Sequence, residues 1–213
     1  MRYHERKCLI ISGGEFSPLP ETKLSPDYVI ACDIGWQHAG KLNLTPDIVI
    51  GDFDSSPLPD AALPVKIYPK EKDDTDTMFA ARHALSLGFK DITICCAFGG
   101  RADHALANIQ TAAFIVSNGG EAGLIGINTR AIAFTRAKKV FPKPGEYSFS
   151  VFSLSDKCTG VSIRGSLYDC EDISFTNSFP LGVSNGWKKD TVEVSVDSGI
   201  LLVIQSRLQS HLY

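Results

Sequence analysis

The sequence predicts an α/β protein: an N-terminal α/β domain with a mostly parallel sheet over residues 1–128, then a small all-β sandwich domain over residues 129–213. The first part alternates short runs rich in Val and Ile with helical patterns, which is typical of a parallel sheet with helices between its strands. The second part has strand patterns punctuated by Pro and Gly, and no amphipathic helix pattern. With 213 residues, of which 44% are hydrophobic and 21% charged, the chain can bury a sizeable core.

In the first part, the apolar runs read as strands buried on both faces, because they are apolar almost throughout. These strands are expected at residues 8–12, 28–32, 47–50, 65–68, 92–98 and 122–127. Helices are expected at residues 35–42, 74–87 and 103–118. In the last helix, Leu106, Ile109, Ala113 and Val116 should lie on one face, with Asp103 as the N-cap.

In the second part, Val192, Val194 and Val196 alternate with Glu193 and Ser195, a period of two that is typical of a strand. The other strands are expected at residues 146–154, 161–167 and 200–205. A join between the two domains is expected at residues 131–140.

Composition excludes several classes of protein. The net charge of −3 and the lack of any Lys/Arg run argue against a nucleic-acid surface. No apolar stretch approaches the roughly 20 residues that a membrane helix needs, and the N-terminal run is short enough to be a strand rather than an export signal. The six cysteines form no C-x-x-C pair, so we expect reduced thiols in a cytoplasmic protein and no zinc site.

Polar motifs follow the ends of five predicted strands. They are Gly13-Gly14, Asp33, Asp52 with Asp54, residues 70–76 and residues 99–104. Because ligands of parallel α/β sheets bind outside the carboxyl ends of the strands, we expect all five to converge at one edge.

Closely spaced carboxylates repel one another, and a hard cation among them would offset that repulsion. If the chain is extended at Asp52 and Asp54, both side chains point the same way, which suits Mg²⁺ together with a phosphorylated substrate. An Asp-rich turn that caps a neighbouring element is the alternative. At least one of Asp73, Asp74 and Asp76 is expected to cap the helix that follows.

A strand-to-helix turn at Gly99-Gly100-Arg101 could bind phosphate, since its glycines allow a close approach and Arg101 can donate two parallel hydrogen bonds. The alternative is a plain turn before a helix. His104 has either a chemical role or only a position at the helix start.

Together these motifs resemble the thiamine pyrophosphokinase family, in its bacterial form. The resemblance covers nearly the whole chain and rests on the order and spacing of several short motifs. In chain order these are Gly13-Gly14, Asp33, Thr45-Pro46-Asp47, Gly51-Asp52-Phe53-Asp54-Ser55, Lys72-Asp73-x-Thr75-Asp76, Gly100-Arg101-x-Asp103-His104-x-x-Ala107-Asn108 and Gly182-Val183-Ser184-Asn185.

The resemblance implies an enzyme that transfers pyrophosphate from ATP to thiamine with Mg²⁺, giving thiamine diphosphate and AMP. It also implies a homodimer whose thiamine site lies between the catalytic domain of one subunit and the β domain of the other. On this basis, the metal ligands are Asp52 and Asp54, and the catalytic residues are Asp54 and Asp76. The ATP or phosphate residues are Gly14, Asp33, Lys72, Arg101, Asp103 and His104. The thiamine residues are Asp76, Ser184 and Asn185.

Two departures from the family pattern affect these roles. Cys32 and Ile34 flank Asp33 where the family often has small residues. Animal members carry a Trp that stacks on thiamine, and the corresponding position here is about Leu202. Trp187 could substitute for it or could simply pack.

Three other functions are compatible with parts of the sequence. A pterin pyrophosphokinase of related fold would differ in its acceptor. A haloacid-dehalogenase-type, Mg²⁺-dependent phosphatase would use Asp52-x-Asp54 but leaves residues 72–76 and the β domain unexplained. A non-catalytic thiamine or nucleotide sensor would bind without turnover.

Overall fold

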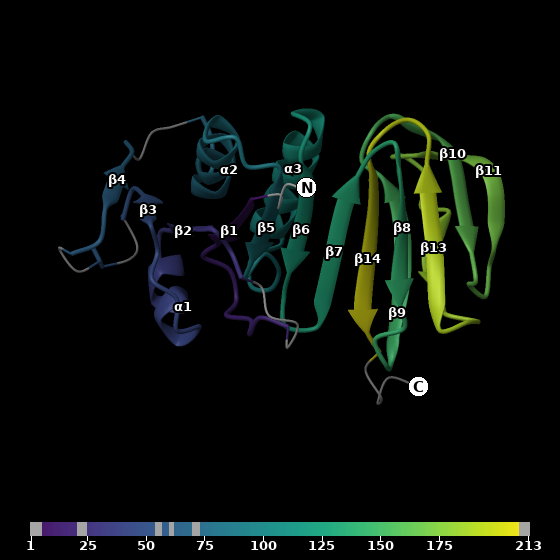
Figure 1. The fold of residues 1–213 in the computed structure, drawn as a ribbon, viewed down its shortest axis with the longest axis horizontal. Coiled ribbons are helices and arrows are strands. Elements are labelled where there is room, and N and C mark those ends of the chain that lie inside the picture. The colour runs from purple at the N-terminus through teal and green to yellow at the C-terminus, as the bar shows by residue number, and fades with distance from the viewer. Residues whose placement is uncertain (1–5, 21–24, 54–56, 60–61, 70–72, 209–213) are drawn as a thin grey trace, which may run out of the picture. The chain divides into compact units, whose positions relative to one another are not determined.

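The structure, a computed structural model, describes residues 6–20, 25–53, 57–59, 62–69 and 73–208. It divides into two compact units, Met1–Ile127 and Asn128–Tyr213. Figure 1 shows strands with intervening helices in the first unit and strands in the second. The expectation of a mixed α/β chain with a separate antiparallel part is confirmed. The expected join at residues 131–140 is wrong, because most of these residues belong to strands β7 and β8.

The first unit alternates strands and helices along the chain. Its elements are β1 (Lys7–Ile11), β2 (Tyr28–Cys32), α1 (Gly35–Lys41), β3 (Ile48–Gly51), β4 (Val65–Ile67), α2 (Asp76–Ser86), β5 (Asp91–Cys95), α3 (Ala102–Ser117) and β6 (Glu121–Ile125). The strands run parallel in the order β6-β5-β1-β2-β3-β4. All their carboxyl ends therefore lie at one edge.

Helices cover both faces of this parallel sheet. Leu9 and Ile11 of β1 cluster with Ala39 of α1. Because side chains alternate along a strand, Ile10 faces the opposite side, where α2 and α3 pack against each other. Ile10 and Ile11 are fully buried, which explains why β1 reads as a continuous apolar run.

The apolar face expected for α3 is only partly buried, since Val116 is buried but other residues around the helix are buried as well. Leu106 is 57% exposed, whereas Asn108, Thr111 and Ala112 are buried. The two polar side chains can be buried because each donates a hydrogen bond to a backbone carbonyl, Asn108 to Ala97 at 2.9 Å and Thr111 to Ala107 at 2.9 Å. A pattern search that counts only apolar residues cannot find such a face.

The N-caps of α2 and α3 also differ from expectation. Thr75 is the N-cap of α2, and its hydroxyl accepts a hydrogen bond from the Met78 amide at 3.2 Å. Arg101 occupies the N-cap position of α3, so the expectation of an Asp103 cap is wrong. None of the helices described here is long and apolar enough to span a membrane.

The second unit consists of strands. They are β7 (Thr129–Phe134), β8 (Ala137–Pro142), β9 (Tyr147–Ser153), β10 (Lys157–Arg164), β11 (Cys170–Thr176), β12 (Gly182–Asn185), β13 (Thr191–Val196) and β14 (Leu201–Arg207). They pair antiparallel in the orders β12-β9-β14-β7 and β11-β10-β13-β8.

The core of the second unit is formed by both groups of strands, with Phe149 and Val203 from one and Val161 and Val194 from the other. Trp187 belongs to this core. Trp187 is 8% exposed, and its indole N–H donates to the Phe141 carbonyl at 3.1 Å. Its ring packs edge-on against the ring of Phe149, with the ring centroids 4.9 Å apart. These contacts account for Trp187 as a packing residue.

Candidate active site

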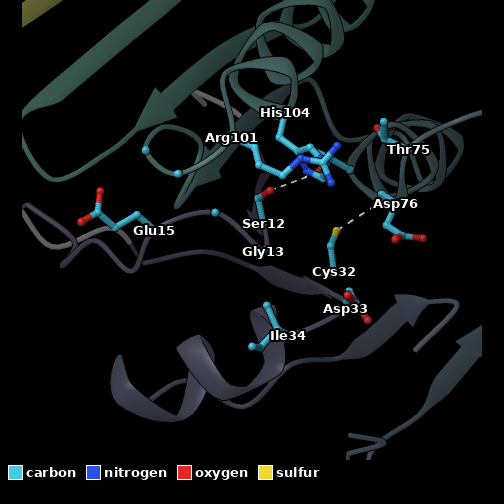
Figure 2. A pocket seen from close by; sticks show the side chains of 14 residues that line it. Ser12, Gly13, Glu15, Cys32, Asp33, Ile34, Thr75, Asp76, Arg101 and His104 are labelled. Carbon is cyan, nitrogen blue, oxygen red and sulfur yellow. Dashed lines mark hydrogen bonds between the residues drawn. The ribbon is translucent and has the colours of Figure 1, made fainter. Parts of the chain in front are cut away.

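A cavity of about 740 Å³ opens at the carboxyl edge of the parallel sheet. Segments that are far apart in the sequence line it, and Figure 2 shows them from close by. The lining residues come from the end of β1, the end of β2, the start of α2 and the β5–α3 turn. Of the residues predicted for the site, the cavity brings together Gly14, Asp33, Asp76, Arg101 and His104.

Asp33 follows β2 in a conformation that is unusual for a residue with a side chain. Its φ is 48°, in the left-handed region. The Asp33 amide donates to the Ile50 carbonyl at 2.8 Å. The Asp33 carboxylate lies against Gly51: if residue 51 had a Cβ atom, that atom would be 3.4 Å from Asp33 Oδ1. The carboxylate of Asp33 is thereby directed to the cavity and lies beside the end of β3, one residue before Asp52. The larger residues at positions 32 and 34 are accommodated around this turn, where both line the cavity.

Asp76 is the first residue of α2, and Asp33 and Asp76 lie at the same end of the cavity in Figure 2. The hydroxyl of Thr75 caps this helix, as described above. Asp74 instead forms an ion pair with Arg82, with Nε and Oδ2 at 3.0 Å. The N-cap of α2 is therefore Thr75 rather than an aspartate, whereas Asp76 lies in the first turn, where a carboxylate favours the helix dipole.

Arg101 and Asp103 form a bidentate salt bridge at the start of α3. The distances are 3.1 Å from Nε to Oδ1 and 2.5 Å from Nη2 to Oδ2, and Oδ1 also accepts the His104 amide at 3.0 Å. The Arg101 guanidinium holds the pKa of Asp103 at about 2, well below its usual value. Arg101 and His104 line the cavity, whereas Asp103 does not. Asp103 therefore lies outside the cavity and orients the guanidinium of Arg101, which lines it.

The predicted metal ligands are only partly described. Asp54 and Lys72 lie outside the described residues. Asp52 directly follows β3 but is not among the residues lining the cavity. The next residue, Phe53, has φ 54°, so the extended geometry expected between Asp52 and Asp54 is wrong at this point. Within the described part of the chain, no three His, Cys, Asp or Glu side chains gather as a metal site.

Three lining residues that the sequence analysis missed are buried and polar or thiol-bearing: Ser12, Cys32 and Thr77. Each directly precedes or follows a predicted motif residue, so adjacency to Gly13, Asp33 and Asp76 is the signal that could have found them. Burial, followed by the negative charge of Asp76, raises the pKa of the Cys32 thiol well above its usual value. Cys32 therefore stays protonated and can donate a hydrogen bond.

Ser184 and Asn185 belong to the second unit, in a strand with a shifted register. Ser184 is exposed and has a left-handed φ of 57°. The Oδ1 atom of Asn185 accepts from the amides of Tyr168 and Gly186, and its Nδ2 donates to Ser166 Oγ and the Tyr168 carbonyl. Since these four hydrogen bonds use the capacity of the amide, Asn185 organises this loop, whereas Ser184 presents its side chain to the surface.

Comparisons with known proteins identify the family. Residues 21–121 match the model of "Thiamin pyrophosphokinase, catalytic domain", and residues 139–201 match "Thiamin pyrophosphokinase, vitamin B1 binding domain". This chain belongs to the thiamine pyrophosphokinase family. The thiamine pyrophosphokinase of Bacillus subtilis is 28% identical over 215 residues, which covers 92% of this chain and 97% of the relative.

Solved structures of thiamine pyrophosphokinases have the same fold as this chain. The B. subtilis enzyme has a TM-score of 0.83 at 25% identity, covering 96% of this chain and 100% of that chain. A family protein from Enterococcus faecalis has a TM-score of 0.76 at 25% identity, with the same coverage. The Candida albicans protein, at 14% identity and a TM-score of 0.73, covers 95% of this chain and 89% of that chain and supports the fold alone.

The two family matches divide the predicted site residues between them. The catalytic-domain match contains Asp33, Asp76, Arg101 and His104 of the cavity. Gly14 precedes it, in the turn after β1. The vitamin B1 binding match contains Ser184 and Asn185.

Proposed function

We propose that this chain is a thiamine pyrophosphokinase, which transfers pyrophosphate from ATP to the hydroxyl of thiamine and releases AMP. The observation that carries the proposal is the cavity at the carboxyl edge of the sheet, most of whose lining lies in the stretch matched by the family's catalytic domain. The match to the vitamin B1 binding domain supports thiamine as the acceptor.

ATP would place its phosphates against the β5–α3 turn. Gly99 and Gly100 have φ values of 90° and 67°, which let the backbone turn sharply into α3. The N-terminus of a helix carries partial positive charge and unpaired N–H groups, which favour phosphate. Arg101, oriented by Asp103, presents its guanidinium at the cavity wall, although the ionised Asp103 carboxylate offsets much of its positive charge.

Mg²⁺ would be held by Asp52 and Asp54. The residues fit this ion because Mg²⁺ prefers oxygen ligands and is usually bound by one or two carboxylates together with substrate phosphates. The carboxylate of Asp33 lies against Gly51, the residue before Asp52, and so supplies one carboxylate near the end of β3. When bound, the metal would neutralise charge on the phosphates.

Asp76 is our candidate for the acceptor side of the reaction. The hydroxyl oxygen of thiamine attacks the β-phosphorus of ATP, and the bond to the AMP oxygen breaks. Asp76 would position that hydroxyl or accept its proton. The acidic end of the cavity, formed by Asp33 and Asp76, also suits the cationic thiazolium ring.

We propose that the active form is a homodimer in which Ser184 of one subunit reaches the thiamine bound by the other. Exposed apolar side chains precede Ser184 in the chain at Phe179, Leu181 and Val183, and those of Leu167 and Tyr168 lie in a segment that bonds to Asn185 and Gly186. Clusters of exposed apolar residues commonly mark protein interfaces, and a second copy of this chain would cover this one.

Cytoplasmic localisation fits the six free cysteines of the structure.

The decisive assay incubates the protein with Mg²⁺, ATP and thiamine and identifies the products by mass. Thiamine diphosphate and AMP in equal amounts are expected. Inorganic phosphate without AMP would indicate a phosphatase, transfer only to a pterin would indicate the related pyrophosphokinase, and binding without turnover would indicate a sensor.

Asp54→Asn should abolish turnover. Asp156→Asn, which changes an exposed carboxylate of the second unit, should not. Normal AMP release by the Asp54 variant would contradict its role.

The shared site can be tested with mixed dimers. Asp76→Asn and Ser184→Ala should each be nearly inactive alone. Reassociated in equal amounts, they should recover about a quarter of wild-type activity, because half of the dimers are mixed and each has one intact site. A monomer in light scattering, or no recovery on mixing, would overturn the dimer proposal.

A further inference from the structure

Two buried hydroxyl groups join α2 to the strand β1 beneath the cavity. Ser12 Oγ and Thr77 Oγ1 are 3.2 Å apart, although the residues are 65 positions apart in the sequence. Each residue is only 6% exposed. Both line the cavity, and Figure 2 draws this hydrogen bond as a dashed line from Ser12.

Each end of this link is itself anchored. The Ser12 amide donates to the Cys95 carbonyl at 3.0 Å, so Ser12 continues the ladder between β1 and β5. Thr77 is the second residue of α2, directly after Asp76. The Ser12–Thr77 bond therefore ties the first turn of α2 to an interior strand of the sheet.

A second contact reaches the same turn from β2. The Cys32 thiol, 2% exposed, donates to the backbone carbonyl of Asp76 at 3.6 Å. The backbone around Asp76 is therefore held from two neighbouring strands. The Cys32 thiol, at the end of β2, binds the Asp76 carbonyl, and the Ser12 hydroxyl, directly after β1, bonds to Thr77, the next residue. Neither contact uses the Asp76 carboxylate.

We propose that Ser12 and Thr77 are positioning residues that hold the Asp76 carboxylate in register with the acceptor hydroxyl. The proposal rests on the proposed function, in which Asp76 acts on thiamine. The first turn of a helix is its least constrained part, because its amides have no partners within the helix. Burying a hydroxyl without a hydrogen-bond partner is costly, and here the two hydroxyls bond to each other at the residue next to Asp76.

The link predicts a particular pattern in kinetics. A displaced Asp76 would weaken the chemical step more than ATP binding, because Arg101 and the β5–α3 turn lie on other elements. We expect Ser12→Ala and Thr77→Val each to lower kcat by about tenfold while KM for ATP changes by less than about twofold. Since both variants break the same bond, the double variant should be about as impaired as either single one.

Two further variants separate positioning from a general loss of packing. Thr77→Ser restores the hydroxyl and should recover kcat to within about threefold of wild type. Thr111→Val is the matched control, since Thr111 is also a buried helical threonine, but it bonds to Ala107 of its own helix and lies outside the cavity. It should leave kcat unchanged per folded molecule, as measured with circular dichroism and steady-state kinetics on the same samples.

Several results would overturn the proposal: unchanged kcat in Ser12→Ala and Thr77→Val, additive losses in the double variant, or failure of Thr77→Ser to rescue. A wild-type protein that forms no thiamine diphosphate would overturn the proposed function and this inference with it. An active wild type with unimpaired variants would overturn this inference alone. Amide hydrogen exchange at residues 77–79 gives a readout without substrate, and it should quicken in Thr77→Val but not in Thr111→Val.

Discussion

Gly14 approaches the backbone of Cys96 so closely that a Cβ at residue 14 would lie 2.2 Å from the Cys96 carbonyl oxygen. This contact brings the turn after β1 against the end of β5 at the wall of the cavity. Real Cβ atoms do not come this close to a backbone oxygen, so any side chain at residue 14 would push the two segments apart. The glycine is needed here for space.

Gly14→Ala should therefore destabilise the protein by about 2 kcal/mol and reduce activity, since overpacking against backbone typically costs about 1–3 kcal/mol. Gly40→Ala is the matched control. Gly40 lies inside α1, and nothing would contact its Cβ within 4 Å, so this change should stabilise the helix by up to about 1 kcal/mol. Urea unfolding measures both. Equal stability of the two variants would contradict the close-approach argument.

Asn108→Ala should loosen the start of α3. The Asn108 side chain, 5% exposed, donates to the Ala97 carbonyl in the segment that leads from β5 to the phosphate-facing turn. Loss of this bond leaves a buried carbonyl unpaired, at a cost of about 1–3 kcal/mol, and should raise KM for ATP. Asn118→Ala, at the exposed end of the same helix, should cost less than about 1 kcal/mol and leave KM unchanged. Thermal unfolding and initial rates test the pair of variants.

Ser184→Gly should separate stability from activity. Ser184 has a φ of 57°, which is costly for a residue with a Cβ, so glycine should stabilise the protein by about 0.5–1 kcal/mol. Activity should fall, because the proposed contact with thiamine is lost. Asn43→Gly is the control, since Asn43 has φ 55° after α1 and should gain less stability without losing activity. A fully active Ser184→Gly variant would argue against a role for the Ser184 side chain.

The Arg101–Asp103 pair should remain ionised from below pH 4 upwards. A carboxylate with a depressed pKa contributes stability above its ordinary pKa of 3.8 and loses it as the pH falls through about 2. Carbon-13 NMR of the Asp103 carboxyl should give a midpoint near 2. In Arg101→Gln the midpoint should return toward 3.8, because the guanidinium is the main cause of the shift. A midpoint that stays near 2 in this variant would assign the shift to another group.

The sequence by itself determined the α/β class, the places of the first six strands and the meeting of Gly14, Asp33, Asp76, Arg101 and His104 at one edge of the sheet. These follow from local chemistry. Runs such as the one in β1 are apolar almost throughout because helices cover both faces of the sheet. Parallel strands bring their carboxyl ends to one edge whatever lies between them. Asp33, Asp76 and Arg101 could be proposed for one site because each directly follows a strand or opens a helix.

Only the tertiary structure decided how the polar side chains are used. Asn108 and Thr111 are buried in α3, and the Asn108 amide donates to the Ala97 carbonyl outside the helix, a partner that helical periodicity does not reveal. Thr75, rather than an aspartate, caps α2. The bond between Ser12 and Thr77 joins residues 65 positions apart, and Asp103 serves Arg101 rather than the cavity. A residue's type states which bonds it can make, but only the packed chain brings a distant partner within hydrogen-bonding distance.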